Sequence, residues 1–195
     1  MSKRKVKRKS FAAREDLLEK MNKIAKENEF SLYRFVNEVF ELTLKVHELG
    51  VNMRTLIYSR RLLNDARENG FTLGLENIWY DMAELAYDKN KKKALQSWNE
   101  SGIWLAKRYI TSEIEDPFET FKKDLQDFTW NVPEFEVNKE KNKIAVRIVS
   151  PRFTEAYTEL FTAFMEGALQ TFEYTIDNTE VSRGIIRLDA TKNTN

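Results

Sequence analysis

The sequence predicts a mainly helical protein with a small β content, in which a basic two-helix module precedes a C-terminal α+β domain. Apolar residues recur every three to four positions over several segments, a spacing that places them on one face of a helix. Two segments near residues 134–149 instead alternate apolar and polar residues, as half-buried strands do. With 42% hydrophobic and 32% charged residues among 195, the chain has enough apolar material to form a core. The predicted boundary separates residues 1–49 from residues 50–195.

The N-terminal module begins with a basic tail and a short predicted strand over residues 9–14. A helix is expected from Glu15 to Asn28, because Leu17, Met21 and Ile24 share one helical face. Ser31 suits the N-cap of a second helix that ends near Gly50.

The C-terminal domain is predicted as four helices, a hairpin, a long helix and a last strand. The four helices are expected over residues 52–69, 73–88, 92–111 and 117–128. Asn52 and Asp116 suit N-caps, and the basic run over residues 89–93 separates the second helix from the third. The hairpin joins 134–137 to 143–149, and the last strand covers 180–188. Between them a long helix covers 152–173, with Ser150 as its predicted cap and Pro151 at the first helical position.

Charge is distributed unevenly along the chain. Residues 1–14 hold seven of the 32 Lys and Arg residues and none of the 31 Asp and Glu residues. Such a concentration of positive charge favours a polyanionic partner, and the alternative is a solubilising tail.

Several classes of function are disfavoured by composition. The chain has no cysteine and one histidine, His47, which argues against disulfides and multi-histidine metal sites, and we expect no cofactor. No Gly-rich phosphate loop and no nucleophile with a histidine partner is recognisable, so an enzyme is not expected. No apolar run approaches a membrane span, which predicts a cytoplasmic protein without a membrane partner.

The first 49 residues resemble the ribbon-helix-helix family of DNA-binding proteins (the Arc, MetJ and CopG type). The resemblance rests on the run from Lys9 to Met21, then Ile24-Ala25, then the Ser31-capped helix with Phe35-Val36 and Val39-Phe40. It implies a dimer in which paired strands form a two-stranded ribbon in the major groove.

In the predicted strand, Phe11 and Ala13 point into the core. Because successive side chains of a strand point to opposite faces, Arg8, Ser10 and Ala12 are expected to contact the bases. Ala12 and Arg14 depart from the family, which usually has a longer polar residue and a proline there. The expected phosphate contacts are Lys3, Arg4, Lys5, Lys7, Lys9, Ser31, Leu32 and Tyr33.

About fifty residues toward the end of the chain are faintly similar to vinyl-reductase-like ligand-sensor domains, on the hairpin, the Phe164–Ala168 run and the Val181–Ile186 run. The middle of the chain is rich in aromatic residues, among them Trp79, Tyr80 and Trp130. These residues suit either the walls of a sensor pocket or an ordinary core and interface.

Together these observations predict a dimeric, sequence-specific DNA-binding transcriptional regulator, a repressor, with a C-terminal oligomerisation or ligand-sensing domain. Its expected partners are double-stranded DNA, a second copy in a homodimer or higher homo-oligomer, and, as an open alternative, a small-molecule effector. Binding to DNA would make this cytoplasmic protein nucleoid-associated. The main alternative is a DNA-organising or segregation protein of low sequence specificity. An antitoxin and a pure protein-interaction module are further alternatives.

Overall fold

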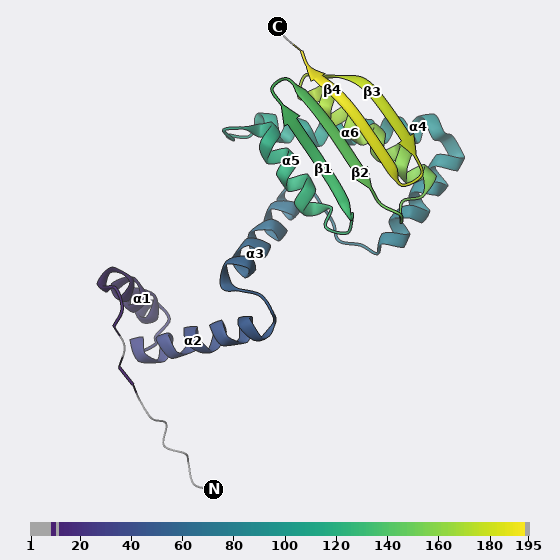
Figure 1. Ribbon diagram of the computed structural model, residues 1–195. Coiled ribbons are helices and arrows are strands. Elements are labelled where there is room, and N and C mark those ends of the chain that lie inside the picture. The colour runs from purple at the N-terminus through teal and green to yellow at the C-terminus, as the bar shows by residue number, and fades with distance from the viewer. Residues whose placement is uncertain (1–8, 11, 194–195) are drawn as a thin grey trace. The chain divides into compact units, whose positions relative to one another are not determined.

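The computed structural model describes residues 9–10 and 12–193, which belong to two compact units, Met1–Arg60 and Arg61–Asn195 (Figure 1). The division falls within the third helix, α3 (Met53–Glu68). The described part is mainly helical and contains one four-stranded antiparallel sheet. This agrees with the predicted fold class at the level of a helical protein with a small β content.

The first unit is built on the helices α1 (Glu15–Glu27) and α2 (Leu32–Glu48), which pack on each other. Ser31 is the N-cap of α2, as predicted, and its hydroxyl accepts a hydrogen bond from the Arg34 N–H at 3.2 Å. Only Ala25, Val36 and Val46 are buried among the described residues of this unit.

The strand predicted over residues 9–14 is not observed in the described residues 9–10 and 12–14. A strand needs a partner for its backbone N–H and C=O groups. These residues pair with no other described segment of the chain. The ribbon of the predicted N-terminal module is therefore not shown.

The second unit contains three further helices and the whole sheet among the described residues. Its remaining elements are α4 (Glu76–Thr111), α5 (Pro117–Phe128), β1 (Glu134–Glu140), β2 (Lys143–Val149), α6 (Glu155–Thr171), β3 (Tyr174–Ser182) and β4 (Ile185–Lys192). The sheet order is β1-β2-β4-β3. Figure 1 shows α6 lying behind the sheet, and α6 also packs along α4.

The sheet has one buried and one exposed face. Along β2 and β4 the exposure alternates residue by residue, so Ile144, Val146 and Ile148 join Ile186 and Leu188 in the core. Arg147, between two of these residues, lies on the exposed face. Because the helices cover only one face, the sheet shows the alternation that the sequence predicted for the hairpin.

Several helices begin or break where local sequence signals predict. The Asn52 and Asp116 side chains accept hydrogen bonds from the Thr55 and Glu119 N–H groups at 2.9 and 3.0 Å, as expected for N-caps. The predicted break in the basic run is also present. Asn90 has a non-helical backbone within α4, and its side chain accepts a hydrogen bond from the Lys93 N–H at 3.0 Å.

The C-terminal end of the chain differs from the prediction of a single last strand. Residues 174–192 form a hairpin of β3 and β4, and Gly184 occupies the turn with a φ of 77°. The Gly184 N–H donates to the buried Thr158 hydroxyl at 2.9 Å, which ties the turn to α6. The predicted Ser150 cap is likewise wrong, because Thr154 caps α6 instead.

Two glycines allow α4 and α6 to approach closely. A Cβ atom on Gly102 would overlap the carbonyl group of Phe164, and one on Gly167 would overlap the carbonyl group of Asn99. The two helices therefore pack backbone against backbone at these positions.

Candidate ligand-binding pocket

An apolar pocket of about 450 Å³ lies in the second unit, where the end of α3 meets the end of α5. Gly70 ends α3 in the left-handed region with a φ of 82°, and Phe71 then folds back so that its N–H donates to the Ala66 carbonyl. The Phe71 ring packs against Phe128 of α5 at 4.6 Å between ring centroids. The pocket is lined by Leu63, Ala66, Arg67, Phe71, Thr72, Leu73, Phe128 and Trp130.

A second, smaller pocket of about 220 Å³ adjoins the first, since the two share Thr72, Leu73, Phe128 and Trp130. It adds polar groups to an otherwise aromatic wall. Its other lining residues are Gly74, Glu76, Trp79, Tyr80, Asn131 and Tyr157. An apolar chamber with a few converging polar groups is the usual design of a small-molecule site.

Glu76 is the centre of the polar cluster. Its carboxylate accepts hydrogen bonds from the Tyr80 hydroxyl at 2.5 Å, from the Asn131 amide at 2.9 Å and from Arg152 at 2.9 Å. These donors hold the pKa of Glu76 below its ordinary value, with the Tyr80 hydroxyl contributing most, although partial burial opposes the shift. Glu76 is therefore ionised at neutral pH, and three donors already satisfy its carboxylate.

The wall behind this cluster is a group of packed rings. Tyr157 lies 4.8 Å from Tyr80, 4.7 Å from Phe153 and 5.2 Å from Trp98 between ring centroids. Burial raises the pKa of Tyr157 to about 12 and also raises the pKa of Tyr80, whose donation to Glu76 adds to the shift. Both phenols are therefore neutral at physiological pH, and the wall carries no charge of its own.

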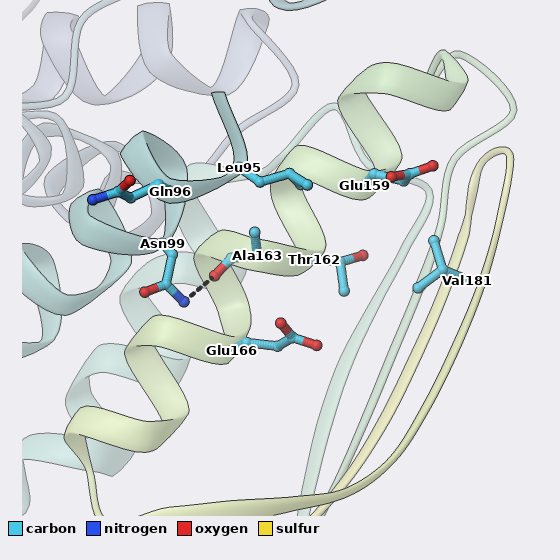
Figure 2. Close-up of a pocket in the computed structure, with 8 residues that line it drawn as sticks. All are labelled: Leu95, Gln96, Asn99, Glu159, Thr162, Ala163, Glu166 and Val181. Atoms are coloured by element: carbon cyan, nitrogen blue, oxygen red, sulfur yellow. Dashed lines mark hydrogen bonds between the residues drawn. The ribbon is translucent and has the colours of Figure 1, made fainter. Parts of the chain in front are cut away.

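A separate groove of about 460 Å³ lies between α4, α6 and the end of β3 (Figure 2). Figure 2 shows Glu159, Thr162 and Glu166 of α6 along one side, with the Asn99 amide donating to the Ala163 carbonyl at 3.1 Å. Glu159 is paired with Lys91 at 2.6 Å. Glu166 is half-buried, and burial raises its pKa above the ordinary 4.5 even though Thr179 donates to it at 3.3 Å.

Glu166 gives the first testable prediction. Its pKa is higher in the folded than in the unfolded chain, so ionisation of Glu166 lowers stability as the pH rises from the ordinary value of 4.5 through the raised folded value. We expect Glu166→Gln to increase the free energy of unfolding at about pH 7.5 and to leave it unchanged at about pH 3, where both side chains are neutral. Urea unfolding at the two pH values measures this difference. An equal effect at both would show that burial of the charge is not the cause.

Of the DNA-contact residues predicted from the sequence, those that the structure describes belong to the first unit and are not among the residues that line these pockets. Lys3, Arg4, Lys5, Lys7 and Arg8 fall outside the described residues, whereas Lys9, Ser10 and Ala12 are exposed and not in a strand. Ser31, Leu32 and Tyr33 form the cap and first turn of α2. Their assignment to bases and phosphates stays a prediction.

Sequence reasoning found part of the pocket and missed the rest. Trp79, Tyr80 and Trp130 stood out as aromatic candidates for a pocket wall, and all three line one. The Glu76 cluster was missed, because Asn131 and Arg152 lie 55 and 76 positions from Glu76 in the chain. No local pattern connects residues at such separations.

Comparison with known proteins returns no matching family model and no matching curated protein. Among solved structures, the chain is similar to the IWP-051-bound H-NOX from Shewanella woodyi, with 13% identity over 92% of this chain and 95% of that one and a TM-score of 0.40. It is also similar to an H-NOX domain from Shewanella oneidensis, with 12% identity, coverage of 80% and 98%, and a TM-score of 0.40. A third structure, from work on heme distortion in the H-NOX family, has 16% identity, coverage of 72% and 89%, and a TM-score of 0.38. Likeness at this level assigns neither a family nor a ligand.

These comparisons contradict the predicted function. The similar structures are H-NOX domains in the Fe(II)CO state or in work on heme, and their descriptions do not mention DNA. The predictions of a dimeric DNA-binding transcriptional regulator, of the DNA-organising alternative and of double-stranded DNA as partner are therefore wrong. The ribbon-helix-helix resemblance is not shown, because no family model matches and the described residues 9–10 and 12–14 form no strand.

Histidine, cysteine, methionine and tyrosine are the commonest protein ligands of heme iron. The residues of this chain do not fit a heme held by histidine or cysteine. The single histidine, His47, is exposed on α2 in the first unit, and the chain has no cysteine. Two tyrosine hydroxyls of the second unit are already committed, Tyr80 to Glu76 and Tyr109 to Asp124. Within the described residues, no group of three metal-binding side chains is found, and no helix is long and apolar enough to cross a membrane.

Proposed function

We propose that the second unit is a ligand-binding domain, which takes a small, largely apolar molecule in the pocket between α3 and α5. The observation that carries the proposal is the pair of adjoining pockets, one walled by apolar side chains and the other ending in the Glu76 cluster. The faint similarity of the sequence to vinyl-reductase-like sensor domains agrees with it.

Apolar side chains at the pocket rim support this proposal, because leaving them in water is unfavourable. Trp79, Trp130 and Leu73 are 44%, 61% and 74% exposed, so the pocket rim retains much apolar surface that a ligand would cover. Burying apolar surface contributes roughly 25 cal/mol per Å². The packed rings of Tyr80, Tyr157 and Phe153 hold the inner wall in place before a ligand arrives, which reduces the entropy lost on binding.

We also propose that the domain binds without transforming its ligand. No histidine or cysteine occurs among the described residues that line the two pockets. Glu76, the carboxylate in the smaller pocket, has a lowered pKa and three donors, so it is poorly suited to accept a proton. Binding alone is the activity that these groups support.

The test uses the full chain and Nile red, an uncharged dye whose fluorescence rises in apolar surroundings. We expect saturable binding that Ala66→Trp weakens at least about tenfold, because the indole fills the apolar pocket. Ala145→Trp is the matched control, since Ala145 is exposed on the outer face of β2. Leu73→Asp, at an exposed rim residue, provides a second variant that does not disturb the core. Binding that is equal in all four proteins would refute the proposed site.

A further inference from the structure

The apolar pocket contains one charged lining residue, Arg67, in the last turn of α3. Among the described residues, no ion pair or hydrogen bond of its guanidinium is observed, as is also the case for the exposed Arg61 and Arg183, whereas several other arginines of this unit are engaged. Arg152 is paired with Glu76, and Arg108 donates to the Glu68 carbonyl. The acidic neighbours of Arg67 in sequence, Asp65 and Glu68, do not line the pocket.

A guanidinium beside an apolar chamber selects a ligand with two chemically different ends. Its planar N–H groups match a carboxylate, with which they form two parallel charge-assisted hydrogen bonds. Leu63, Phe71 and Phe128 supply apolar contacts for the remainder of the ligand.

The second pocket determines which way such a ligand would lie. Glu76 is ionised there and its acceptor positions are occupied by Tyr80, Asn131 and Arg152. A carboxylate placed beside it would meet like charge, which disfavours that orientation. The acidic end of the ligand is therefore directed to Arg67 and its apolar end toward the aromatic wall.

We propose that the pocket binds a medium-chain carboxylic acid as its anion, with the carboxylate on Arg67 and the hydrocarbon chain among the apolar residues. This inference rests on the function proposed above, and it adds the chemical class of the ligand and its anchoring residue.

The experiment compares decanoate with 1-decanol, which has the same chain length without the charge, by displacement of Nile red from the full chain at neutral pH. We expect decanoate to bind about tenfold more tightly than decanol, the effect of a hydrogen-bonded charge pair. Arg67→Gln is expected to remove that preference while changing decanol binding less than about twofold. Arg61→Gln, at an exposed arginine of the same helix that does not line the pocket, is the matched control.

The outcomes separate the two proposals. Equal binding of decanoate and decanol, or a decanoate preference that survives Arg67→Gln, would overturn the carboxylate inference and leave the apolar site standing. Failure of Nile red, decanol and decanoate to bind the unaltered chain would instead overturn the proposed function. Decanoate binding that weakens with added salt in the unaltered chain, but not in Arg67→Gln, would further support the charge pair.

Discussion

Replacing Gly102 with alanine is expected to destabilise the second unit by about 3 kcal/mol, at the upper end of the usual cost of overpacking. Gly102 lies where α4 crosses α6, and a Cβ atom there would overlap the Phe164 carbonyl and come within 3.1 Å of the Ala168 nitrogen. Both groups belong to the backbone of α6, so they cannot move aside as the end of a flexible side chain would. The helices must separate, and the residues buried between them lose contacts.

Chemical unfolding of the full chain, followed by the fluorescence of the second unit's tryptophans, measures this loss. Ser101→Ala is the matched control, because Ser101 is exposed on the adjacent position of the same helix and its change is expected to fall within about 0.5 kcal/mol. Gly167→Ala should resemble Gly102→Ala, since its Cβ would overlap the Asn99 carbonyl from the opposite helix. If both glycine variants unfold at the same denaturant concentration as the unaltered chain, the close packing of α4 and α6 is incorrect.

Replacing Phe121 with alanine is expected to cost roughly 3–5 kcal/mol of unfolding free energy, the range for a buried phenylalanine. Phe121 is 2% exposed, and its ring lies 5.5 Å from Tyr109 of α4 and 5.1 Å from Phe172 at the end of α6. Truncation leaves a cavity at the point where α5 joins both helices. Because α5 ends at Phe128, which lines the apolar pocket, the same change should also weaken Nile red binding.

The control for this prediction is Phe121→Leu, which retains most of the buried volume. We expect it to lose less than half as much stability as Phe121→Ala and to preserve dye binding. A full loss of binding without a loss of stability would show that Phe121 contacts the ligand directly. That result would contradict the role given to it here as a core residue that positions α5.

Whether a segment of this protein is a helix or a strand followed largely from its local sequence. The caps Ser31, Asn52 and Asp116 were correctly identified, because a cap is decided by a side chain and a backbone N–H three positions away. The β1–β2 hairpin followed from alternation. The last hairpin was missed because β3 is mostly exposed and lacks a clear alternating pattern, so only its pairing with β4 defines it.

Function was less accessible from the sequence, because the features that suggested DNA binding are not specific to one class of protein. The seven basic residues within 1–14 favoured a polyanionic partner, and the helices behind them resembled a DNA-binding module. Charge density and two amphipathic helices are compatible with many proteins, and the strand that would have distinguished this module is not among the described elements.

By itself, the sequence determined the helical character of the chain, the position of most helix starts, the β1–β2 hairpin and the aromatic residues available for a pocket. Each of these depends on contacts between residues close in the chain, which spacing and side-chain chemistry reveal. Only the tertiary structure decided that Glu76, Asn131 and Arg152 meet, that Arg67 lines an apolar chamber, and that two glycines bring α4 against α6. These arrangements join residues tens of positions apart, and only the packing of helices on the sheet brings them together.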